Sequence, residues 1–223
     1  MPVYVVFLAV SFLASIVGAV CGIGGGVIIK PVLDAFGVLD VSAISFLSGC
    51  TVLAMSLYSV GRNKIAGTLS VDMSTGTPLA AGAAVGGVVG KYMFQAVRQM
   101  FENQNTVGAV QAACLMILTL GTLIYTLKKS CIKTHHLKNV PACLAIGLFL
   151  GILSSFLGIG GGPINLVILF YFFSMTTKVA AQNSLYIILF SQVTSLVVSV
   201  FTGTMPSVEW GILAGMVVCG VLG

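Results

Sequence analysis

Apolar residues in this chain occur in long, nearly uncharged runs separated by short polar segments. Val3–Cys21 and Val107–Leu127 are two such runs, and each has about the 20 residues that a helix needs to cross a bilayer. Only 7% of the 223 residues are charged and 58% are hydrophobic, whereas about a quarter of the residues in a soluble domain are charged. The runs therefore predict an all-α, polytopic transmembrane helix bundle, with room for about seven or eight membrane segments.

Two of these runs are interrupted by the same glycine-rich motif. Gly22-Ile23-Gly24-Gly25-Gly26 recurs as Gly158-Ile159-Gly160-Gly161-Gly162, and neither copy contains a charged residue. Adjacent glycines remove side-chain cover from the backbone and permit backbone angles that other residues avoid. The segments that follow, Val27–Phe36 and Pro163–Phe173, are too short to cross a bilayer. We therefore expect two broken membrane helices, each with a short half-helix or re-entrant segment behind the glycines.

The motif belongs to an internal repeat. Leu79–Gly90 in the first part of the chain resembles Ile212–Gly223 in the second part. We expect residues 1–138 to form a first transmembrane repeat and residues 139–223 to form a second. The first part continues well beyond Gly90, so the second repeat is expected to be incomplete at its C-terminal end.

Positive charges lie mainly in the loops and predict the orientation. Arg62 and Lys64 are two crossings away from the basic loop Lys128–Lys138, so both loops are expected on one side, with Lys178 toward the other. The larger number of loop cations assigns the first side to the cytoplasm. If each short segment leaves the membrane where it entered, both repeats start on that side and the repeat is parallel. The loop bias accounts for the net charge of +5, and we expect no nucleic-acid partner.

The glycine motifs also indicate the chemistry of a solute. A helix N-terminus carries unpaired amide protons and about half a positive charge, so it binds an anion without a dedicated side chain. Broken segments at matching places in two repeats indicate a transport site between them. We expect Gly24–Gly26 and Gly160–Gly162 to offer amides to a small anion. Protons and sodium ions are the candidate coupling ions.

The doubled Gly-x-Gly-Gly-Gly motif resembles the sulfite exporter TauE/SafE family of permeases. The serine-rich helix that follows the first copy and the lysine-rich central loop fit this resemblance, which covers nearly the whole chain. It implies a multi-pass carrier of the inner cell membrane, usually with about eight membrane segments in two halves. It also implies a solute such as sulfite, a sulfonate, a related sulfur compound or another small organic anion.

The candidate solute-binding residues are the motif glycines and a few polar side chains inside apolar runs. Lys30 is an intramembrane cation and thus a functional candidate, although Asp34 lies one turn later and could neutralise it. Asparagine side chains could bind the anion or bond to neighbouring helices, and the glycines could serve close helix packing alone. The predicted set comprises Gly22, Gly24, Gly25, Gly26, Lys30, Ser48, Gly158, Gly160, Gly161, Gly162, Asn165 and Asn183.

Two other functions fit parts of the sequence. A membrane thiol or redox protein could use Cys21 and Cys50, although buried thiols are usually inert, and an incomplete fragment would not transport at all. The six cysteines include no Cys-x-x-Cys pair, so we expect no metal site and no cofactor. We expect a transporter embedded in the lipid bilayer and not an enzyme.

Overall fold

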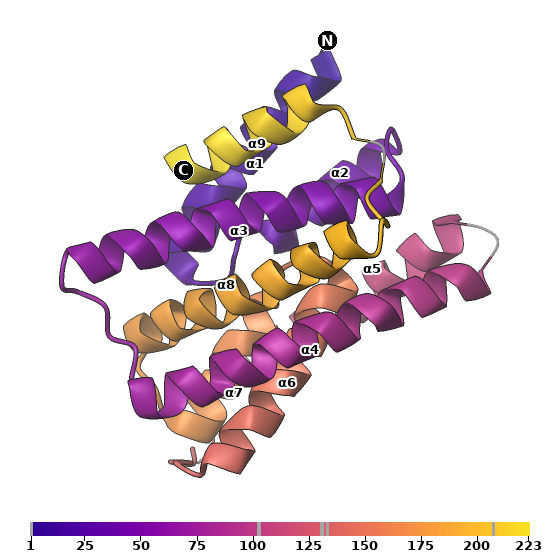
Figure 1. Ribbon diagram of the computed structural model, residues 1–223. Helices are drawn as coiled ribbons and strands as arrows, with labels where there is room; N and C mark the ends of the chain where they lie inside the picture. Colours follow the sequence, from indigo (N-terminus) through magenta and orange to yellow (C-terminus); the bar gives the residue numbers. More distant parts are fainter. Residues whose placement is uncertain (1, 102–103, 130–131, 133, 207) are drawn as a thin grey trace.

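The computed structural model describes residues 2–101, 104–129, 132, 134–206 and 208–223 (Figure 1). Glu102, Cys131 and Lys133 lie outside the described residues. The described part is all-helical, without a strand, and five of its helices (α1, α3, α5, α6 and α8) are long and apolar enough to cross a membrane. The predicted all-α polytopic bundle is thus confirmed. The helices are α1 (Pro2–Cys21), α2 (Gly26–Phe36), α3 (Val41–Ile65), α4 (Met73–Met100), α5 (Gln104–Lys128), α6 (Val140–Leu157), α7 (Gly162–Phe173), α8 (Thr177–Phe201) and α9 (Trp210–Leu222).

The short helix α2 runs back alongside α1. Gly22 has a φ angle of +69°, which only glycine adopts easily, and the chain turns there. Gly25 then lies against the backbone of Ala14, and the ring of Phe36 at the far end of α2 meets the ring of Phe7 at a centroid distance of 6.1 Å. Helices α1 and α2 therefore form an antiparallel hairpin, with the glycine cluster at its tip.

The short helix α7 runs back alongside α6 in the same way. Gly158 ends α6 in the left-handed conformation, with a φ angle of +65°. At the other end of α7, the carbonyl groups of Tyr171 and Phe172 accept hydrogen bonds from the backbone of His135 and Leu137, just before α6. The second glycine cluster is thus also the tip of an antiparallel hairpin.

Helices α3 and α8 cross at the centre of the bundle and run in opposite directions. Gly49 in α3 faces Gln192 in α8, whereas Ser70, in the loop after α3, bonds to Gln182 near the start of α8. Both ends of α8 (177 and 201) lie 136 residues beyond the corresponding ends of α3 (41 and 65). Gly158 likewise lies 136 residues beyond Gly22. The helix order of the two halves therefore corresponds, although their boundary at residues 138 and 139 stays a prediction.

The two halves are inverted relative to each other, and the expected parallel orientation is wrong. That expectation assumed that each short segment leaves the membrane on the side where it entered, so that the chain stays on that side. In the structure, α2 carries the chain back to the side of the N-terminus, so α3 starts on that side and Lys178 lies on the same side as the loop after α3. Lys178 thereby joins the basic loops, which the bias toward cytoplasmic cations assigns to the cytoplasm.

Close helix packing holds the hairpins in place. In Figure 1, α3 and α8 lie between the pair α1–α9 and the pair α4–α6. Gly82, Gly86 and Gly90 of α4 have Gly-x-x-x-Gly spacing and lie directly against the backbone of α6, the close helix contact that this spacing favours. Leu79 and Leu150 fill the apolar core beside this contact.

Candidate functional site

The two glycine clusters meet each other at the centre of the molecule. Gly26 lies against the carbonyl group of Ile159, and Gly162 lies against the side chain of Val27. All eight motif glycines are buried. A β-carbon would collide with a neighbour at seven of these positions and would lie tightly against Ile188 at Gly24, so the close contact of the hairpin tips depends on residues without a side chain.

Both tips rest on the same two side chains, halfway along α3 and α8. A β-carbon built on Gly24 would lie 3.2 Å from Ile188 and 3.5 Å from Val52, and one on Gly160 would lie 3.2 Å and 2.8 Å from the same residues. Val52 and Ile188 are again 136 positions apart. The tips therefore meet around an approximate two-fold axis between α3 and α8, at the midpoint of two membrane-length helices.

Buried polar side chains without hydrogen-bond partners lie beside the tips. Ser48 and Ser184 hold equivalent positions in α3 and α8, both are 0% exposed, and neither hydroxyl has a partner. Asn165, also 0% exposed, has no partner for either polar side-chain atom, and its amide lies 2.7–2.8 Å from the place of a β-carbon on Gly161. Because native structures leave few buried polar atoms unpaired, these groups point to a polar ligand or water.

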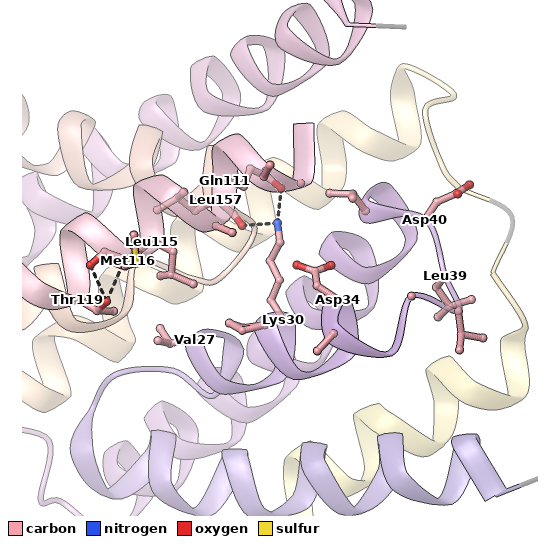
Figure 2. A pocket seen from close by; sticks show the side chains of 18 residues that line it. Val27, Lys30, Asp34, Leu39, Asp40, Gln111, Leu115, Met116, Thr119 and Leu157 are labelled. Carbon is pink, nitrogen blue, oxygen red and sulfur yellow. Dashed lines mark hydrogen bonds between the residues drawn. The ribbon is translucent and has the colours of Figure 1, made fainter. Parts of the chain in front are cut away.

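Lys30 lies one turn into α2 and connects the first hairpin to the second (Figure 2). Its ammonium donates hydrogen bonds to Ser45 Oγ (2.9 Å), Gln111 Oε1 (2.5 Å) and the carbonyl oxygen of Leu157 (2.7 Å). These contacts bury all but 3% of the side chain. Asp34 lies beside Lys30 but shares no hydrogen bond with it, and its Oδ1 atom is buried without a partner.

Two hollows approach the tips from opposite ends of α3. The first, of about 790 Å³, lies between α2 and α5 and is lined by Lys30, Val27, Leu157 and Val41 among others. The second, of about 400 Å³, includes Ala181, which touches Gly22, together with residues from the end of α3 and the end of α1. Neither hollow is lined by a motif glycine. The closed tips thus separate two hollows, and each hollow reaches residues directly beside the tips.

Comparisons with known proteins identify the family of this chain. The sequence model of the sulfite exporter TauE/SafE family matches residues 7–223. The chain belongs to the TauE/SafE family. One curated relative is the probable membrane transporter protein YunE of Bacillus subtilis (strain 168). The two sequences are 22% identical over 222 residues, and the match covers 90% of this chain and 79% of the relative. No solved structure matches the chain. The protein is therefore a multi-pass membrane transporter of this family.

Most of the residues predicted as a site in this TauE/SafE transporter lie together, but Asn183 does not. Its side chain donates hydrogen bonds to the carbonyl groups of Val179 (2.8 Å) and Ser70 (3.5 Å), and its Oδ1 faces Gly76 of α4. Asn183 therefore bonds within α8 and to the loop after α3, while its Oδ1 is buried beside α4 without a hydrogen-bond partner. Solute contact by the other predicted residues stays a prediction.

Sequence reasoning did not identify Gln111 as part of the site of this family member. Gln111 donates a hydrogen bond to the carbonyl group of Phe156 (2.5 Å) as well as accepting one from Lys30. Its signal in the sequence is that it is an isolated amide in the apolar run of α5, where polar groups seek partners on other helices. Its partner could not be foreseen, because Gln111 and Phe156 are 45 residues apart.

The two cysteines of the alternative thiol hypothesis lie in different surroundings. Cys21 is exposed at the end of α1, and Cys50 is partly buried in α3. Both are free thiols. No feature of the described residues joins them into one site.

Proposed function

We propose that this TauE/SafE family member carries a small anion, namely sulfite, another sulfur oxyanion or an organosulfonate, by alternating access around the hairpin tips. The observation that carries the proposal is the contact of two glycine tips between hollows on opposite sides. Separation of the tips toward one hollow and then toward the other would expose the same central groups to each side in turn.

The chemistry of the tips favours an anion. Helices α2 and α7 both begin at a tip, and neither N-terminus receives a side-chain hydrogen bond. Their first amide protons and the positive ends of their dipoles are available to a negative charge once the tips part. Asn165, Ser48 and Ser184 add donors without partners, and the ammonium of Lys30 supplies the nearest full positive charge.

The tips are closed in this structure, so alternating access requires them to move. The glycines allow this because backbone contacts between the tips can part without the removal of large side chains. The central anion would then replace the contacts that Gly26 and Gly162 make across the tips in the closed form. Protons or sodium ions are the proposed coupling ions.

Transport by purified protein tests the proposal directly. The chain is reconstituted into liposomes, and uptake of radiolabelled sulfite is measured in competition with thiosulfate, alkanesulfonates and carboxylates. We expect saturable uptake that sulfur oxyanions or sulfonates inhibit best. Uptake no faster than in empty liposomes for every anion would refute the proposed function. Unchanged uptake after Cys21→Ser and Cys50→Ser together would exclude the thiol alternative.

Access from the two sides tests the mechanism separately. On a background in which all cysteines are replaced by serine, Thr119→Cys labels the first hollow and Ser59→Cys the second. We expect an impermeant thiol reagent to reach these two positions from opposite faces of the membrane. We expect a transported anion to change the two labelling rates in opposite directions. Labelling of both positions from one face would rule out this mechanism.

A further inference from the structure

Lys30 lies beside the C-terminal end of α6, and helix ends of this kind attract a cation in other broken-helix carriers. Leu157 is the last residue of α6, so its carbonyl group is one of the last four carbonyls that lack a partner inside the helix. The C-terminal end of a helix carries about half a negative charge. In carriers with broken helices, such ends and nearby backbone carbonyls coordinate Na⁺. Here the Lys30 ammonium takes that place, 2.7 Å from the Leu157 oxygen.

The three atoms around the ammonium are the kind of ligands that a hard monovalent cation prefers. They are a hydroxyl, a side-chain amide oxygen and a backbone carbonyl oxygen, from Ser45, Gln111 and Leu157. All three are neutral oxygens, and they come from α3, α5 and α6. Asp34 provides a carboxylate nearby without binding the ammonium directly. The arrangement is a small cage of oxygens that holds one positive charge.

The position equivalent to Lys30 in the other half, which the structure describes, holds no cation. Position 166, which is 136 residues after Lys30, is Leu166, and the helix end equivalent to Leu157 is Cys21. The equivalent of Ser45 is Ala181. The oxygen cage is therefore a feature of one hairpin contact and not of the general plan of the two halves.

We propose that the Lys30 ammonium is a built-in cation that fills a monovalent-cation site at the end of α6. Free Na⁺ is therefore not needed there in the natural protein, and removal of the side chain opens this site to Na⁺. The inference deepens the proposed function, since it concerns the coupling ion of that carrier. Its test measures cation binding through protein stability, so it succeeds or fails independently of anion transport.

The experiment compares the melting temperature of detergent-purified wild-type protein and Lys30→Ala in NaCl, KCl and N-methylglucamine chloride at equal ionic strength. We expect no difference among the salts for the wild type. For Lys30→Ala we expect a lower Tm in N-methylglucamine and a saturable recovery in Na⁺ or K⁺. At a cation concentration about 100 times Kd, the recovery should reach about 5–10 °C for a chain of this size.

Two further variants show whether the oxygen cage causes the recovery. Leu166→Ala is the matched control, since it makes a comparable truncation at the equivalent position of α7, and it should lose stability equally in all three salts. Lys30→Ala combined with Gln111→Leu removes one oxygen ligand and should lose the recovery.

Three outcomes would overturn the inference. One is a Lys30→Ala protein whose Tm is the same in all three salts. Another is a wild-type protein with the same saturable Na⁺ response as Lys30→Ala. The third is a Lys30→Ala protein that cannot be recovered even when it is extracted in NaCl, because a free cation must be able to replace the ammonium.

Discussion

Gly26→Ala adds one methyl group where the two hairpin tips touch, and this contact sets its cost. The new β-carbon would lie 2.8 Å from the carbonyl carbon and 2.9 Å from the α-carbon of Ile159. Carbon atoms normally pack about 3.5–4.0 Å apart, so the tips must separate by roughly 1 Å. The obstacle is backbone and not the flexible end of a side chain, so it cannot move aside cheaply.

The expected loss follows from two opposing terms. Overpacking of a buried contact costs about 1–3 kcal/mol, and replacement of glycine by alanine in a helix returns at most about 1 kcal/mol. Because the clash is with backbone, the overpacking cost lies at the upper end of this range, about 2–3 kcal/mol. We therefore expect a net destabilisation of about 1–2 kcal/mol after the full gain in helix propensity, and a Tm lower by about 2–8 °C. The Tm is measured on detergent-purified protein, and transport in liposomes should also slow because the closed form no longer seals.

Gly121→Ala in α5 is the matched control. No neighbouring atom lies within 4 Å of its new β-carbon, so only the helix propensity changes and the Tm should stay level or rise by about 1–4 °C. If Gly26→Ala melts at or above the wild-type temperature while Gly121→Ala behaves as expected, the tips do not touch and the description of the closed form is wrong.

Three further predictions concern the tips, the packing and a helix cap. Gly161 has a φ angle of +87°, so Gly161→Val should abolish anion uptake while membrane insertion persists; normal uptake in liposomes would contradict the role of the glycines. Gly86→Val places a β-carbon 2.9 Å from backbone atoms of α6 and should lower the Tm by about 2–12 °C, from about 1–3 kcal/mol of overpacking; an unchanged Tm would disprove this contact. Asp72 caps α4 by accepting hydrogen bonds from Ser74, which hold the pKa of this carboxyl below its usual value of 3.8. Asp72→Ala should cost about 1 kcal/mol near neutral pH, and its difference from the wild type in Tm should vanish as the pH falls from 3.8 through the lowered pKa; a difference that persists in acid would refute the cap.

The sequence predicted the helical membrane bundle correctly because length and apolarity of a run depend on that run alone. Val3–Cys21 is long enough for a bilayer whatever it packs against. The same holds for the spacing of Gly82, Gly86 and Gly90, which indicates a surface for close helix contact without naming the partner helix. The family resemblance also required only local motifs, and the match over residues 7–223 agrees with it.

The predicted orientation of the two halves is wrong because the orientation depends on where the short segments end in space. Loop charges alone cannot tell whether Val27–Phe36 turns the chain back, and one wrong assignment of this kind inverts every later helix. The hydrogen-bond partners of Lys30 could not be predicted for a related reason. Asp34 does lie beside Lys30, but the ammonium donates hydrogen bonds to oxygens that are 15, 81 and 127 residues away in the sequence.

The sequence by itself determined that this protein is a membrane-embedded helical transporter with two glycine breaks, because hydrophobicity and glycine content act residue by residue. Only the tertiary structure decided that the two breaks meet between Val52 and Ile188, that the halves are inverted, and that Lys30 closes the end of α6. These features arise from contacts between segments that are separated in the sequence, and such contacts are fixed by how the helices pack together.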